Sequence, residues 1–81
     1  MNNELLIGMW EALDATHQHE ILVLAQHPTE RNGCYTTGYF TALHYSRLLP
    51  NEDYTYWLAA IGQIENDPDF RKEVLNLMKG E

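Results

Sequence analysis

Ile21-Leu22-Val23-Leu24-Ala25 is an uninterrupted apolar run between Glu20 and Gln26. In an α-helix, five consecutive side chains point in all directions, so this turn needs packing partners on several sides. The segments before and after it carry apolar residues mainly on one face, and such segments are able to cover it. The sequence therefore predicts a helix at the centre of a small helical core.

The length and composition of the chain predict one folded domain, residues 1–81. Hydrophobic residues make up 44% of the sequence, which is close to the usual globular fraction, so we expect a packed core. A domain of this size buries only about 60% of the surface of its unfolded chain, and self-association would add stability.

The first helix is expected near the N-terminus, with Asn2 or Asn3 as its N-cap. Apolar residues then recur at helical spacing: Leu5, Leu6, Met9, Trp10 and Leu13. The segment 14–16 predicts a break, with Asp14 or Thr16 capping a second helix. No glycine or proline enforces that break, so one continuous helix is the alternative.

The second helix is expected to end near His27, because Pro28 disfavours the helical conformation in the residue before it. Residues 28–34 are predicted as a loop. The pair Asn32-Gly33 is a strong turn signal, and a short hairpin-like turn around it is conceivable.

The third helix is expected to begin with Thr36 or Thr37 as its cap and to be closed by Pro50. Its predicted stripe contains Tyr39, Phe40, Leu43, His44, Arg47 and Leu48.

Two further helices complete the predicted fold. Asn51 is the expected cap of the fourth, whose apolar stripe is the clearest in the chain: Tyr54, Trp57, Leu58, Ile61 and Ile64. Asp67 and Pro68 provide a cap and a first residue for the fifth, which carries Phe70, Val74, Leu77 and Met78 and ends near Gly80. The sequence thus predicts an all-α bundle of four or five short helices, orthogonal rather than up-and-down.

The charge is strongly negative, with 12 acidic and 5 basic residues for a net charge of −7. Residues 1–30 and 51–69 contain no lysine or arginine. Such a surface repels phosphate backbones, so direct nucleic-acid binding is disfavoured. It attracts a basic partner, because complementary fields speed encounter; solubility alone is the simpler explanation of the same charge.

Metal binding and catalysis are disfavoured by spacing. Structural zinc ligands are usually about two to five residues apart, and the soft ligands here do not form such sets: His17, His19, His27, Cys34 and His44. Cys34 lacks an evident base or oxyanion site and is expected to be a half-buried loop cysteine. The carboxylates at 52–53 and 67–69 are explained by helix dipoles. We therefore expect no catalytic residue, no metal and no cofactor.

The N-terminus, Met1-Asn2-Asn3-Glu4, lacks the basic region of a signal peptide. No apolar run approaches the roughly 20 residues needed to span a bilayer. A cytoplasmic protein with no membrane contact is therefore expected.

Seven of the nine aromatic residues lie between Tyr35 and Trp57, more than one small core readily holds. Tyr35, Tyr45 and Tyr56 fall off the predicted stripes. Exposed tyrosines beside acidic residues are typical of recognition surfaces. The predicted partner-binding residues are Tyr35, Tyr45, Glu52, Asp53, Tyr56, Glu65, Asp67 and Asp69.

These features favour a non-enzymatic, acidic protein that masks or inhibits a basic partner, such as a nucleic-acid-binding protein. In size and charge the chain is similar to small inhibitors carried by phages and other mobile elements, and to immunity proteins against nucleases. A homo-oligomeric adaptor is one alternative. A degenerate helix-turn-helix regulator is another, although Pro50 would break its recognition helix.

Overall fold

The computed structural model describes residues 4–79, with side chains through Leu77. Five α-helices follow one another in this range, and no strand is present within it. They are α1 (Glu4–Glu11), α2 (Ala15–Gln26), α3 (Glu30–Tyr45), α4 (Asn51–Asn66) and α5 (Pro68–Lys79). The predicted all-α fold of four or five helices is therefore confirmed.

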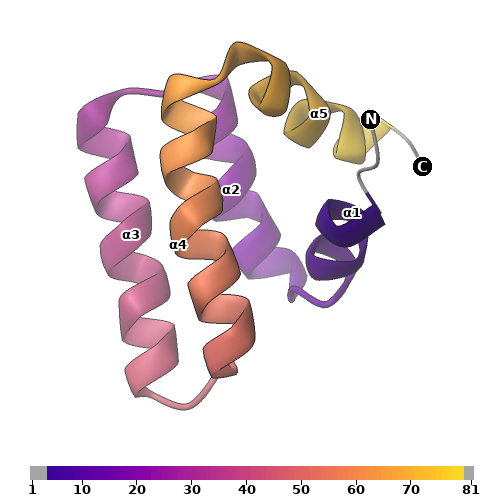
Figure 1. Ribbon diagram of the computed structural model, residues 1–81. Helices are drawn as coiled ribbons and strands as arrows, with labels where there is room; N and C mark the ends of the chain where they lie inside the picture. The colour runs from indigo at the N-terminus through magenta and orange to yellow at the C-terminus, as the bar shows by residue number, and fades with distance from the viewer. Residues whose placement is uncertain (1–3, 80–81) are drawn as a thin grey trace.

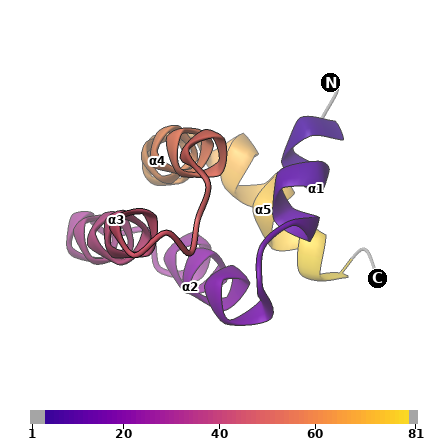
Figure 2. The same ribbon diagram turned by 90° about the horizontal axis from the view of Figure 1, so that it is seen from below.

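Three of the helices run alongside one another, and two cross them. Figure 1 shows α3 and α4 lying side by side and α2 behind them. The view in Figure 2 looks nearly down the axes of α3 and α4, whereas α1 and α5 are seen from the side. The arrangement is thus closer to an orthogonal bundle than to an up-and-down one.

The apolar run of residues 21–25 lies at the centre of the core, as predicted. Ile21 and Leu24 are fully buried and Ala25 is buried, whereas Leu22 and Val23 are half-buried. Fully buried side chains from the other helices complete the core: Phe40, Trp57, Ile64 and Val74. The helix that holds the apolar run, α2, is enclosed by α3, α4 and α5, all of which contact it.

The predicted break after the first helix is confirmed. The Asp14 carboxylate accepts a hydrogen bond from the Thr16 backbone N–H at 3.1 Å and so caps α2. The Gln18 side chain in turn donates to the Trp10 carbonyl of α1 at 2.8 Å. Two helices therefore form because both ends at the break have hydrogen-bond partners. The predicted caps Asn2 and Asn3 lie outside the described residues.

The predicted loop over residues 28–34 is wrong beyond its first two positions. Thr29 caps α3 by accepting from the Asn32 backbone N–H at 3.1 Å, so Asn32 and Gly33 are helical and form no hairpin-like turn. A Cβ atom at Gly33 would collide with the Glu65 carboxylate of α4. The glycine is thus explained by the close approach of another side chain, not by a turn.

Because α3 begins early, its predicted caps lie inside it. Thr36 is buried and Thr37 half-buried, both within the helix. The helix also ends earlier than predicted, at Tyr45 instead of Pro50. Its predicted stripe positions Arg47 and Leu48 therefore lie in the following turn and are exposed.

The starts of α4 and α5 differ in how well the sequence predicts them. Pro50 occupies the N-cap position of α4 and Asn51 its first helical position, so the predicted side-chain cap from Asn51 is wrong. Asp67 caps α5 as predicted, accepting from the backbone N–H groups of Asp69 at 3.0 Å and Phe70 at 3.3 Å. The predicted positions at Met78 (side chain) and Gly80 lie outside the described part of the chain.

Candidate protein-binding surface

Two turns that are distant in sequence meet at one end of the molecule. The first joins α1 to α2, and the second joins α3 to α4. In the second turn Arg47 has a φ of 63°. The Arg47 N–H donates to the His44 carbonyl at 3.0 Å and the Leu48 N–H to the Leu43 carbonyl at 2.9 Å. This is the Schellman pattern of helix termination, with arginine where glycine is usual.

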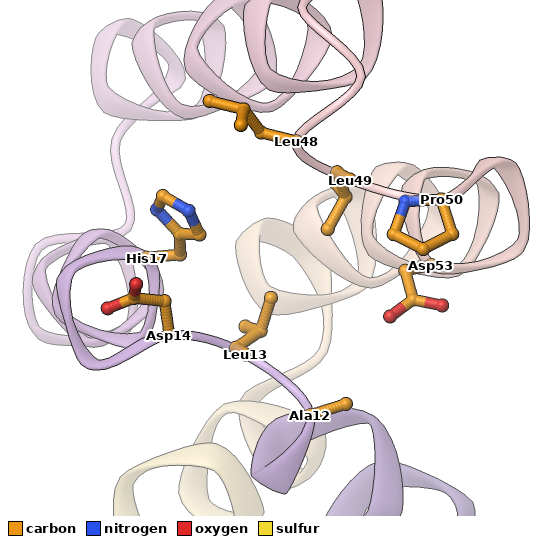
Figure 3. A pocket seen from close by; sticks show the side chains of 8 residues that line it. All are labelled: Ala12, Leu13, Asp14, His17, Leu48, Leu49, Pro50 and Asp53. Atoms are coloured by element: carbon orange, nitrogen blue, oxygen red, sulfur yellow. The ribbon is translucent and has the colours of Figure 1, made fainter.

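A cleft of about 530 Å³ lies between these two turns (Figure 3). Such a volume is in the range of small-ligand sites, about 300–1,000 Å³. The lining residues are Ala12, Leu13, Asp14, His17, Leu48, Leu49, Pro50 and Asp53. Leu13 and Leu49 extend into the space between the turns, and Asp53 lies on the side opposite His17 and Asp14. The cleft therefore combines apolar walls with carboxylates from two helices.

The polar groups of the cleft differ in how they are engaged. The Asp14 carboxylate caps α2, accepting from the Thr16 N–H. Nδ1 of His17 lies 2.9 Å from the Tyr39 hydroxyl and hydrogen-bonds to it. The half-buried Asp53 carboxylate has no hydrogen bond or ion pair with any residue that the structure describes. Asp53 is thus the charged group of the cleft that is left to receive a partner.

The end of α3 and the turn that follows it carry two large exposed side chains. Leu48 is 67% exposed, and Tyr45, three residues earlier, is 78% exposed. His44 holds the adjoining end of α3 against α4, because its ring stacks on that of Tyr54 with centroids 4.3 Å apart. The Tyr54 hydroxyl lies 3.0 Å from Thr41 Oγ1, which joins the same two helices. Tyr45 and Leu48 therefore project from a well-supported base.

The predicted partner-binding residues fall into separate groups. Tyr45 is the last residue of α3, and Glu52 and Asp53 are in the first turn of α4, which begins after a short turn; Asp53 lines the cleft. The others lie toward the opposite end of α3 and α4: Tyr35, Glu65, Asp67 and Asp69. Twelve helical residues between Asp53 and Glu65 span about 18 Å. Apart from Tyr56, these residues are therefore divided between two ends of α3 and α4.

Tyr56 belongs to neither group. It is half-buried and lies edge-on to Trp57 with ring centroids 5.1 Å apart. Burial, and secondly the nearby Glu73 carboxylate, raise the pKa of the Tyr56 hydroxyl above its ordinary value of 10.0. Its ring therefore packs toward α5 and is only partly available to a partner.

The remaining tyrosine of the predicted set is on the outside of α3. Tyr35 is 62% exposed and stacks on Tyr39, with ring centroids 6.5 Å apart. Burial is the largest cause of the raised pKa of Tyr39, with smaller contributions from Glu20, Tyr35 and Asp14. The Tyr35 ring is thus accessible, but it does not line the cleft between the two turns.

The soft ligands are dispersed. Within the described residues, no three His, Cys, Asp or Glu side chains lie close enough together to hold a metal ion. Cys34 is exposed on α3, so the expectation of a half-buried loop cysteine is wrong on both counts. The reason is the early start of α3, which places residue 34 on its outer side.

Sequence reasoning missed most of the cleft. Leu13 and Leu48 are predicted only as members of helix stripes, His17 is considered only as a metal ligand, and Leu49 is given no role. One signal was present in the sequence. Leu48 and Leu49 are adjacent and directly precede Pro50, which ends the helix, so both cannot lie on the buried face of that helix. The turn on the other side of the cleft, between α1 and α2, is far away in sequence and gives no such signal.

In comparisons with known proteins, no family model matches the sequence, and no curated protein or solved structure matches it. Among the helices of the described chain, none combines the length and apolar character needed to cross a membrane.

Proposed function

We propose that this protein is a non-enzymatic binding module that masks or inhibits a basic protein partner, through the end of the molecule that holds the cleft. The observation that carries the proposal is that exposed Leu48 lines the same cleft as Asp53, which belongs to the acidic first turn of α4; Tyr45, also exposed, ends the helix before that turn. Large apolar side chains beside unpaired carboxylates are the composition of a binding surface with a charged rim.

The two kinds of residue have different roles in this proposal. Glu52 and Asp53, within a net charge of −7, attract a basic surface and raise the association rate. Tyr45 and Leu48 lose their exposed apolar area to the partner and so slow dissociation. Inhibitors of the anti-defence or immunity type, which cover a nucleic-acid-binding surface, fit this division.

The test begins with photo-crosslinking at position 45 in a lysate of the source cells, to identify the partner. Its association with the wild-type protein is then measured at low salt. We expect the partner to be basic, and Glu52→Lys with Asp53→Lys to slow association by about tenfold or more. An unchanged association rate would refute the proposal.

A matched control is available at the opposite end of the molecule. Glu30 and Asp69 are also acidic residues in the first turns of their helices. Glu30→Lys with Asp69→Lys makes the same change in net charge and in helix-dipole interaction. We expect this pair to slow association far less, because long-range attraction changes while the contact surface does not.

A homo-oligomeric adaptor is the second candidate, favoured by the same exposed Tyr45 and Leu48. Sedimentation over a range of concentrations separates the two, since Tyr45→Ser with Leu48→Ser would dissociate such an oligomer. The helix-turn-helix alternative gains no support, because α3 and α4 lie alongside each other (Figure 1) rather than at the wide angle of that motif.

A further inference from the structure

The cleft between the two turns has one feature that a merely apolar hollow lacks. Its walls combine alanine, leucine and proline side chains with His17 and Asp14 on one side, and Asp53, a carboxylate without a hydrogen bond to any described residue, stands on the other (Figure 3). A cation placed beside this carboxylate would be attracted by its negative charge. The chemistry of the cleft therefore favours a ligand with both an apolar part and a positive charge.

The electrostatic balance at this position also favours a cation. Asp53 lies in the first turn of α4, where the helix dipole contributes a partial positive charge of about one half. Glu52 and Asp53 together carry two negative charges in that turn, and Asp14 adds another across the cleft. The carboxylates thus outweigh the dipole, and an anion would be repelled.

The apolar walls set the shape of the ligand. Leu13 and Leu49 are buried along most of their surfaces, with 6% and 5% exposed, and their ends form the inner wall. Arginine and lysine carry several methylene groups before the charge, and these stems pack on apolar surfaces while the charged end reaches a polar group. Leu48, 67% exposed at the edge, is placed to cover such a stem.

We propose that the cleft receives an arginine or lysine side chain of the protein partner, with its stem against Leu13 and Leu49 and its charged end at Asp53. This inference rests on the proposed function, because it assigns the residue type by which the basic partner is held. The occupant is a side chain of a protein, since the walls offer no group suited to phosphate or to a nucleobase.

The cleft can be tested without the partner, by NMR titration of the isotope-labelled full chain. The probes are N-acetyl-arginine amide and N-acetyl-lysine amide, with N-acetyl-citrulline amide as the uncharged isostere of arginine. We expect the two cationic probes to shift the backbone amides of Leu13, His17, Leu49 and Asp53 in a saturable way. Dissociation constants of about 1–10 mM are expected for so small a ligand.

Citrulline and two variants determine which group carries the charge recognition. We expect the citrulline probe to bind the wild-type protein at least tenfold more weakly than the arginine probe does. We also expect either cationic probe to bind Asp53→Asn at least tenfold more weakly than the wild type, and the spectrum of this variant also reports that it is folded. Asp69→Asn is the matched control, because it removes a charge from the first turn of α5. Equal binding of arginine and citrulline probes, or shifts elsewhere only, would overturn the proposal.

The outcome is distinguishable from failure of the proposed function. If the partner associates in the charge-dependent way described above but its dissociation rate is the same for Asp53→Asn, the cleft assignment fails and the function stands. If the probes bind at the cleft while no charge-dependent partner exists, the function fails and the cleft remains a cation site.

Discussion

Arg47 occupies a backbone conformation that L-residues other than glycine, asparagine and aspartate rarely adopt. Its φ of 63° allows the turn to end α3 and to expose Leu48 beside the cleft. Such strain persists where the surrounding structure requires it, and it is concentrated at functional positions. The conformation of this one residue thus shapes the proposed binding surface.

The first prediction concerns that strain. Arg47→Gly should raise the free energy of unfolding by about 1 kcal/mol relative to Arg47→Ala, because only glycine adopts this φ without steric cost. Urea denaturation of the two variants measures the difference, and alanine controls for loss of the arginine side chain. Equal stability of the two variants would show that Arg47 is not strained.

The second prediction concerns pH. The pKa of Tyr56 is raised by burial and by Glu73, so the folded state holds its proton more tightly than the unfolded chain does. The resulting stability is complete below about pH 10 and is lost as pH rises through the folded-state pKa. Tyr56→Phe should therefore reduce the loss of stability above pH 10.

Chemical denaturation at increasing alkaline pH measures this effect. Tyr45→Phe is the control, because Tyr45 is 78% exposed and should leave the alkaline limb unchanged. Absorbance of the tyrosinate should likewise show late titration of Tyr39 and Tyr56, whose pKa values are both raised, and Tyr56→Phe should remove one of these two contributions. The prediction would be contradicted if Tyr56→Phe removed absorbance only from the early part of the tyrosinate titration curve.

At the scale of the helices, α3 and α4 are joined at both ends by specific contacts. At one end the His44 ring stacks on Tyr54. At the other, the Glu65 carboxylate lies against Gly33 in the first turns of α3, where negative charge interacts favourably with the helix dipole. These contacts hold in place the turn that forms one side of the cleft.

The third prediction uses the second of these contacts. Alanine is favoured over glycine within a helix by about 1 kcal/mol, but a Cβ atom at Gly33 would displace the Glu65 carboxylate. Gly33→Ala should therefore stabilise the protein by about 1 kcal/mol in a Glu65→Ala background and by less than half of that in the wild type. A double-mutant cycle by urea denaturation measures the coupling. Equal gains in both backgrounds would mean that the two residues do not interact.

For the whole molecule, the helices differ in how firmly they are held. The fully buried Ile21, Leu24, Trp57 and Ile64 lie on α2 and α4. The eight-residue α1 buries Leu6 and Trp10 and packs the half-buried Met9 against the core, and a helix this short has few internal hydrogen bonds.

The fourth prediction is the order of amide hydrogen exchange. Amides of α2 and α4 should exchange slowest, at the rate of global unfolding, and those of α1 fastest among the five helices. Native-state exchange followed by NMR measures the rates residue by residue. Exchange of α1 amides as slow as those of α4 would show that the bundle opens as one unit. In that case the α1–α2 turn would be a rigid wall of the cleft.

Individual elements show where prediction from sequence succeeded. The all-round apolar run at 21–25 and the stripe of α4 became the core, because helical periodicity is a local property of the chain. The caps Asp14 and Asp67 were identified for the same reason, since a cap bonds to N–H groups two or three residues away. The predicted turn at Asn32-Gly33 failed because Thr29 caps a helix that already includes both residues, a local signal that competes with the turn preference of the pair.

The sequence by itself determined the class of fold, most helix boundaries and the acidic character of the surface, because all three follow from composition and short-range pattern. Only the tertiary structure decided which charges and tyrosines share a face. It divided the predicted partner residues between two ends of α3 and α4, and it formed a cleft from turns near residues 13 and 49. Proximity of this kind depends on how helices pack, and packing is set by contacts between residues that no local pattern connects.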